Sequence, residues 1–188
     1  MKVPFFPRRV CKINGKLCAQ IDIIAPMVYN DCEREDIMNR RELATQYFLD
    51  GYNCSQALAL AFSDLIPVEK GTLLSMMSSF GGGMGRLREV CGAVSAMFAV
   101  MGILYGYSAP ETGDIKKEHY ARIQDLAARF EAQWGSIVCR DLLGLTQKKD
   151  DPTPAPRTKE YYGTRPCPAI IGDAAEILEN FIKNHPIG

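Results

Sequence analysis

The chain contains very little histidine, since His119 and His185 are its only two imidazoles in 188 residues. Mechanisms that need several histidines, or a Ser-His-Asp or Cys-His-Asn arrangement, therefore have few residues to draw on. An excess of charge is also lacking, because 22 Lys and Arg balance 22 Asp and Glu. A field of one sign over a whole face attracts nucleic acid or anionic lipid, so we expect neither as a partner.

Neither a secretory signal nor a membrane span is expected from the sequence. Residues 1–9 have too short an apolar stretch, and no small-residue cleavage site follows it. Residues 90–107 form an uncharged run of 18 residues, near the lower limit for a span, but the run holds Cys91, Ser95 and three glycines. We interpret it as a buried helix and expect a cytoplasmic protein without membrane insertion.

Closely spaced cysteines are missing as well. None of the seven cysteines belongs to a C-x-x-C pair, and Cys54, Cys91, Cys139 and Cys167 are separated by 37, 48 and 28 residues. Zinc modules commonly use close pairs, and a secreted disulfide framework uses an even number of cysteines, so neither class fits well. In a reducing compartment such thiols are free, metal-bound or transiently oxidised.

Residues 1–38 differ from the rest and are predicted to form an N-terminal extension. Asn14-Gly15, between partly apolar segments, is typical of a two-residue turn in a β-hairpin, in which Cys11 would face Cys18. The plainer interpretation is a flexible or peripheral arm with incidental thiols. No role is assigned to Cys11, Cys18 or Cys32.

From residue 39 onward the apolar residues recur with the period of a helix, which predicts an all-α domain over residues 39–188. We expect a bundle of about six to seven helices around a central apolar helix at 90–105. Helices are predicted at residues 39–51, from 54 to before Pro67, and at 71–80, 88–105, 114–134, 137–143 and from 168 on. Residues 146–166, with four prolines and several charges, are predicted to be a loop.

All four widely spaced cysteines fall at predicted helix beginnings. Cys54 follows Asn53, a preferred N-cap, and Cys167 precedes Pro168, a residue suited to the first helical position. A helix N-terminus presents unpaired N–H groups and about half a positive charge, which favours thiolate over thiol. The alternative is that each of these cysteines is a small apolar filler of the core.

A glycine run precedes Cys91. Gly81, Gly82 and Gly83 lack the following Lys-Ser/Thr pair of a phosphate loop, and no clear strand comes before them. We expect a tight turn or a pocket wall there instead, to which Gly92 would also contribute.

In their order along the chain these segments resemble the C_GCAxxG_C_C family, whose members are described as redox-active and are named for their cysteine pattern. The resemblance runs from about Leu43 to Phe181 and places the family's four cysteines on Cys54, Cys91, Cys139 and Cys167. It rests on residues 51–57, 80–85, 91–95, 135–144 and 167–178. The chain departs from the family at Ala96, where the CGAxxG segment ends in glycine.

The resemblance and the cysteine placement together imply a thiol redox protein, an oxidoreductase in which these four cysteines cycle between dithiol and disulfide. Cys54 or Cys91 is favoured as the attacking thiol, and a redox protein or a small thiol or disulfide would be the partner. No cofactor is needed for this chemistry.

Two alternatives stay open. The same four cysteines would bind zinc or an iron–sulfur cluster if they converge in space. The chain would otherwise be a non-catalytic helical binding module. A homodimer is compatible with each of these functions.

Overall fold

The computed structural model describes residues 12–13, 16–17, 38–110 and 113–187. The chain divides into two units, Met1–Ile37 and Met38–Gly188. In the first unit, β1 (Lys12–Ile13) and β2 (Lys16–Leu17) pair as two-residue antiparallel strands. Residues 14 and 15 and the cysteines at 11, 18 and 32 lie outside the described residues, so the facing of Cys11 and Cys18 stays a prediction.

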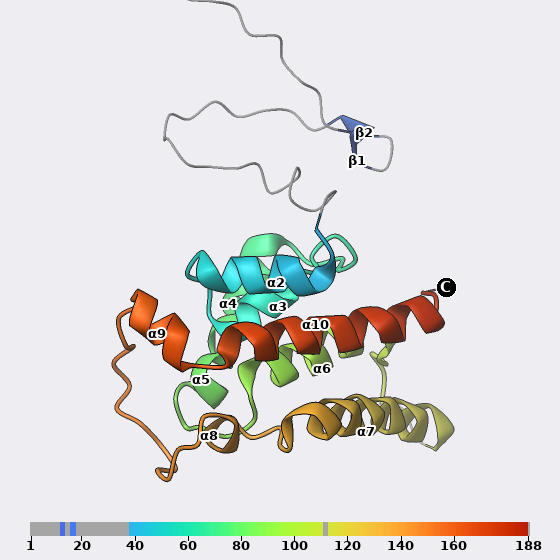
Figure 1. Cartoon of the computed structure of the whole chain (residues 1–188). Coiled ribbons are helices and arrows are strands. Elements are labelled where there is room, and N and C mark those ends of the chain that lie inside the picture. Colours follow the sequence, from blue (N-terminus) through green and yellow to red (C-terminus); the bar gives the residue numbers. More distant parts are fainter. Residues whose placement is uncertain (1–11, 14–15, 18–37, 111–112, 188) are drawn as a thin grey trace, which may run out of the picture. The chain divides into compact units, whose positions relative to one another are not determined.

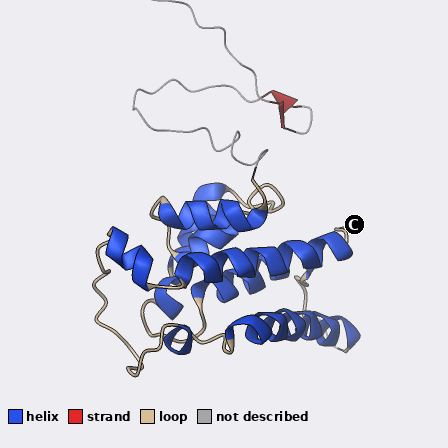
Figure 2. Cartoon of the chain, in the orientation of Figure 1, coloured by secondary structure: helices blue, strands red, loops and turns tan. Residues whose placement is uncertain are grey.

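The second unit is built from helices (Figures 1 and 2). They are α2 (Arg40–Leu49), α3 (Cys54–Leu60), α4 (Lys70–Ser78), α5 (Gly81–Met84), α6 (Gly92–Tyr105), α7 (Asp114–Trp134), α8 (Cys139–Leu142), α9 (Lys159–Thr164) and α10 (Cys167–Asn184). In the described part of this unit no strand occurs beyond an isolated antiparallel bridge between Val90 and Val138. The prediction of an all-α fold is therefore confirmed.

The last helix, α10, joins parts of the bundle that are far apart in the sequence. It packs on α2, α3, α6 and α7, and it lies beside α2 in Figure 1. The apolar helix α6 packs on α3, α7 and α10, as expected for a central helix. In the described ranges, no helix is long and apolar enough to cross a membrane.

The first two helices begin where capping residues predict. Asn39 accepts a hydrogen bond from the backbone N–H of Glu42 over 2.9 Å and so caps α2. Asn53 forms a capping box with Gln56, because its side chain accepts from the Gln56 N–H while the Gln56 side chain accepts from the Asn53 N–H. The Asn53 cap fixes the position of Cys54 as the first residue of α3.

Several predicted boundaries were wrong. Helix α3 ends at Leu60 and not near Pro67, because residues 61–65 form tight turns with i→i−3 hydrogen bonds. The helix predicted to start at residue 88 starts at Gly92, since the preceding backbone has positive φ angles. The predicted loop at 146–166 contains α9.

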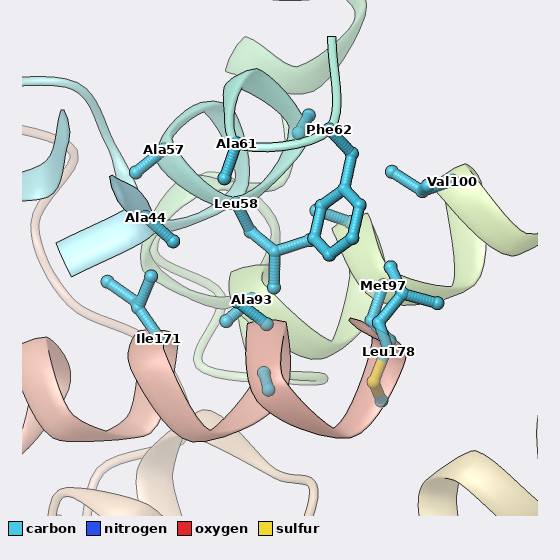
Figure 3. Packing of buried hydrophobic residues seen from close by; sticks show 14 of the residues in the cluster. Ala44, Ala57, Leu58, Ala61, Phe62, Ala93, Met97, Val100, Ile171 and Leu178 are labelled. Atoms are coloured by element: carbon cyan, nitrogen blue, oxygen red, sulfur yellow. The ribbon is translucent and has the colours of Figure 1, made fainter. Parts of the chain in front are cut away.

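The buried core is formed mainly by α2, α3, α6 and α10. In Figure 3, Leu58 and Phe62 point toward the space where Ala93, Met97 and Leu178 lie. The largest fully buried side chains are Phe62, Phe130, Leu43, Leu58, Leu60, Leu73, Met97, Met101, Leu126, Ile171, Leu178 and Val94. Burial of these apolar groups is the main favourable contribution to folding, and it sets how the helices pack.

Leu58→Ala is expected to lower the free energy of unfolding by about 2–5 kcal/mol, because Leu58 is fully buried and its removal leaves a cavity. The matched control is Leu49→Ala, since Leu49 is 43% exposed at the end of α2 and should change stability by only ~0.5 kcal/mol. Urea unfolding followed by circular dichroism measures both changes. Equal losses in the two variants would contradict this description of the core.

Candidate functional site

One pocket is lined by all four of the cysteines singled out in the sequence. Its volume is about 60 Å³, room for only a few water-sized groups at ~10–15 Å³ each. Its other walls are formed by apolar, arginine, tyrosine and backbone groups, including Gly82, Arg88, Leu142, Leu143, Arg157, Tyr161 and Arg165. Segments separated by more than a hundred residues therefore meet at this pocket.

The four cysteines occupy the beginnings of four different helices, as predicted. Cys54 is the first residue of α3, Cys91 is the N-cap of α6, and Cys139 is the first residue of α8. Cys167 is the first residue of α10, so this helix begins one residue earlier than predicted, and Pro166 is its N-cap. All four thiols are free; residues Cys91 and Cys139 are buried, whereas residues Cys54 and Cys167 are partly exposed.

A short backbone pairing sets the positions of two of these cysteines. The bridge between Val90 and Val138 is flanked by hydrogen bonds donated by the backbone N–H groups of Cys91 and Cys139, over 2.8 and 2.7 Å. Side chains alternate between the two faces of a paired strand. The pairing therefore places Cys91 and Cys139 on the same face, which is the face toward the pocket.

The glycine run forms a left-handed turn. Gly82, Gly83, Met84 and Gly85 have φ angles of 65°, 69°, 62° and 61°. The N–H groups of Met84 and Gly85 donate to carbonyls four residues earlier, over 3.1 and 3.0 Å. Glycine adopts this conformation without a steric penalty, whereas Met84 costs about 1–2 kcal/mol there. The turn brings the Gly82 N–H to the Cys54 sulfur as a hydrogen-bond donor.

Two glycines let the backbone approach the sulfur-bearing side chains closely. A Cβ atom at position 92 would overlap the Cys54 sulfur and lie 2.7 Å from the Phe80 carbonyl oxygen. A Cβ atom at position 83 would lie 2.6 Å from the Cys139 Cβ. Of the four glycines expected at the pocket wall, Gly82 lines the pocket, whereas Gly83 lies against Cys139, Gly92 against Cys54 and Gly81 against Asn53.

Arg88 is the buried cation of the site. It is 2% exposed, has a φ angle of 61°, and its Nη1 donates to the Cys139 sulfur over 3.7 Å. Its Nε donates to Asp150 Oδ2 over 2.9 Å, and this contact lowers the pKa of Asp150. Two nearby arginines are neutralised by carboxylates, since Arg86 pairs with Asp150 and Arg140 pairs with Glu89.

Burial outweighs the helix N-termini in its effect on the thiols. It raises the pKa of Cys54, raises that of Cys91 well above its usual range, and raises that of Cys167 to about 12. Backbone N–H groups act in the opposite direction at Cys54 and Cys91 but are the smaller effect. The expected stabilisation of thiolate at the helix beginnings is therefore present but is overcome by desolvation.

The sulfurs also affect one another. Negative charge on Cys54 raises the pKa of both Cys91 and Cys167, and negative charge on Cys139 raises that of Cys54. The four thiols are thus within electrostatic reach of each other in one pocket. Ionisation of one makes ionisation of the next less favourable.

The described residues hold no preformed metal site. Within these ranges, no group of three or more His, Cys, Asp or Glu has a geometry that could hold a metal ion. Neither histidine lines the pocket: His119 contacts the ring of Tyr107, and His185 stacks on Phe181. The four sulfurs share the pocket without forming a ligand cage.

The sequence interpretation missed the residues that approach from the segment predicted as a loop. Arg157, Tyr161 and Arg165 line the pocket from in and around α9. The signal for this helix was Thr158, whose side chain accepts a hydrogen bond from the Tyr161 N–H over 3.2 Å and forms the N-cap. Four nearby prolines obscured it.

Comparison with known proteins agrees with the cysteine pattern. Residues 52–181 match the family model described as "Putative redox-active protein (C_GCAxxG_C_C)". No curated protein and no solved structure matches the chain. The family match spans more than half of the chain and includes all four pocket cysteines.

Gly92→Ala is expected to lower the free energy of unfolding by about 1–3 kcal/mol, because the added methyl group would overlap the Cys54 sulfur. The control is Gly102→Ala in the same helix, where an added Cβ meets nothing within 4 Å. This control should raise stability by ~0.5–1 kcal/mol through helix propensity. Urea unfolding measures both variants, and equal stability would show that position 92 is not crowded.

Proposed function

We propose that this chain, which belongs to the C_GCAxxG_C_C family, carries out thiol–disulfide exchange with the cysteines of the pocket. The observation that carries the proposal is the convergence of four free thiols, from four helix beginnings, on one pocket. Cysteines that served only as apolar filler of the core would not be expected to converge beside a buried arginine. The family description favours the same class of chemistry.

Cys54 is the proposed attacking thiol. Its side chain is partly exposed, and its sulfur accepts hydrogen bonds from the backbone N–H groups of Gly82 and Ser55. Cys91, the other favoured thiol, is buried, and its pKa is raised well above the usual range, so it is less available to an incoming disulfide. The closeness of Gly92 to the Cys54 sulfur supports Cys91 as the resolving thiol.

The exchange proceeds in two displacements. The Cys54 thiolate attacks one sulfur of a substrate disulfide, which forms a mixed disulfide and releases the first substrate thiolate. The Cys91 thiolate then attacks the Cys54 sulfur and releases the second. Each released thiolate takes up one of the protons given up by Cys54 and Cys91. The protein dithiol becomes a disulfide, and the substrate disulfide becomes two thiols.

Metal binding by Cys54, Cys91, Cys139 and Cys167 is the alternative function for the same pocket. Thiol exchange is placed first because the four cysteines are free thiols in one pocket and the family description names redox activity. Metal analysis and a visible spectrum of protein purified without oxygen separate the two. Zinc, or iron with sulfide, in a stable ratio of one site per chain would replace the exchange proposal.

Mild oxidation of the reduced protein with diamide is expected to produce a bridge between Cys54 and Cys91, found by peptide mass mapping. Cys54→Ser and Cys91→Ser should each abolish that bridge, whereas Cys139→Ser should keep it. The mapping is best done with Cys11, Cys18 and Cys32 all changed to Ser, because this removes the thiols of the N-terminal extension. The absence of any bridge among the four pocket cysteines would refute the proposal.

Alkylation of Cys54 by iodoacetamide is expected to become faster up to and beyond pH 9. The thiolate is the reacting species, and burial raises the pKa of Cys54 above the usual value of about 8.5. Below this pKa the rate should increase about tenfold for each pH unit. Cys167, with a pKa of about 12, should react more slowly than an unperturbed thiol at neutral pH, because a much smaller fraction of it is thiolate.

Peptide mapping of time-resolved samples gives the rate at each cysteine, and circular dichroism checks that the fold persists across the pH range. A rate at Cys54 that levels off below pH 8 would contradict the raised pKa.

A further inference from the structure

The charged groups that line the cysteine pocket are all of one sign. Arg88, Arg157 and Arg165 line it, and among the described residues no carboxylate does. The charge of Arg88 is compensated by Asp150. In the described part of the chain, neither Arg157 nor Arg165 forms an ion pair with a carboxylate. Among the described residues, the pocket therefore has two arginines without a directly paired carboxylate, and Asp150 acts on Arg165 only at longer range.

Both guanidinium groups are positioned by aromatic rings. Arg157 lies 4.7 Å from the centre of the Phe48 ring, and its Nη1 donates to the Phe48 carbonyl oxygen over 3.0 Å. Arg165 lies 4.7 Å from the centre of the Tyr161 ring, and Arg157 lies 5.8 Å from the same ring. A guanidinium that stacks on a ring through its face keeps N–H donors at its edge for an anion. The two groups are thus arranged before any ligand binds, which reduces the entropy lost on binding.

The residues that line the pocket differ in exposure, and the more exposed ones mark its entrance. Arg157 is exposed and Arg165 is partly exposed, as are residues Cys54 and Cys167. The thiols of Cys91 and Cys139 are buried. A volume of about 60 Å³ admits the sulfur end of a small molecule but not a folded protein segment. A ligand that entered would keep its outer end beside the two arginines.

We propose that the pocket accepts small disulfides that have an anionic group, such as a carboxylate, a short distance from the sulfur. Arg157 and Arg165 bind the anionic group at the entrance, and the disulfide reaches Cys54. This inference rests on the proposed exchange function and specifies its substrate class. One protein dithiol and one anionic disulfide yield one protein disulfide and two anionic thiols.

Three small disulfides that differ in charge test the inference. Dithiodipropionate has two carboxylates, bis(hydroxyethyl) disulfide is neutral, and cystamine has two ammonium groups. Single-turnover release of thiol from each is measured with the reduced protein and divided by the rate of the same disulfide with free mercaptoethanol. We expect the normalised rate for dithiodipropionate to exceed that for cystamine about tenfold at low ionic strength and to decline toward it as salt is added.

Charge variants separate the two arginines from the charge of the whole protein. Arg157→Gln with Arg165→Gln should bring the rate ratio of dithiodipropionate to cystamine close to one, and the paired change to lysine should retain most of the preference. Lys148→Gln with Lys149→Gln removes two exposed charges from the same connecting segment and should leave the ratio unchanged. The assignment to Arg157 and Arg165 would be overturned if the preference for dithiodipropionate persisted in Arg157→Gln with Arg165→Gln. It would also be overturned if Lys148→Gln with Lys149→Gln lost the preference to the same extent. If Arg157→Gln with Arg165→Gln fails to fold, the inference is tested by Arg157→Lys with Arg165→Lys and by the salt series. Loss of the preference in the lysine variant, or a preference that salt does not reduce, would then overturn it.

A ligand that cannot be reduced distinguishes failure of this inference from failure of the exchange function. Thiodipropionate, a thioether with two carboxylates, should slow the alkylation of Cys54 in the wild-type chain but not in Arg157→Gln with Arg165→Gln. Protection without reduction of any disulfide would support the anion site and refute exchange. Reduction of all three disulfides without charge preference would support exchange and refute the anion site. If the ligand does not protect Cys54 and no disulfide is reduced, both the anion site and the exchange function are refuted.

Discussion

The shared packing of α3, α6 and α10 is the constraint on which the site depends. Helices α6 and α10 pack on each other and run in the same direction. At their N-terminal ends Cys91 and Cys167 line the cysteine pocket, and at the other end the Tyr105 hydroxyl of α6 donates to the His185 carbonyl after α10, over 2.6 Å. The apolar faces that hold these helices together therefore also bring their N-termini to one end of the bundle. Cys91 and Cys167 meet there as a consequence of burial elsewhere.

Two opposing electrostatic effects meet at that end. Helix beginnings and the left-handed turn at residues 82–85 direct N–H groups toward the sulfurs, which favours thiolate. Burial in a pocket of about 60 Å³ removes water and favours thiol, and it is the larger effect at Cys54, Cys91 and Cys167. Burial therefore favours the protonated form of these three thiols, and backbone donors are in place at Cys54 and Cys91 to stabilise the charge that forms as a thiol reacts.

Backbone strain is concentrated beside the sulfurs. Met84, Arg86 and Arg88 all have positive φ angles, and such positions cost about 1–2 kcal/mol each for residues other than glycine. The strained path ends with the Arg88 guanidinium between Cys139 and Asp150, where it is almost fully buried. The packing around this loop holds a conformation that the local sequence does not favour, and it thereby places a cation at the site.

The amino-acid sequence by itself determined the helical period, the caps at Asn39 and Asn53 and the place of each pocket cysteine at a helix beginning, because these features depend on neighbouring residues. It did not reveal α9 or the start of α6, since proline-rich composition obscured the first and no residue type predicts three non-glycine residues with positive φ. Only the tertiary structure decided that the four thiols share one pocket and that burial outweighs the helix N-termini. It also brought Arg157 and Arg165 to the entrance of that pocket. Distances between remote segments and loss of water depend on how whole helices pack, and local patterns contain neither.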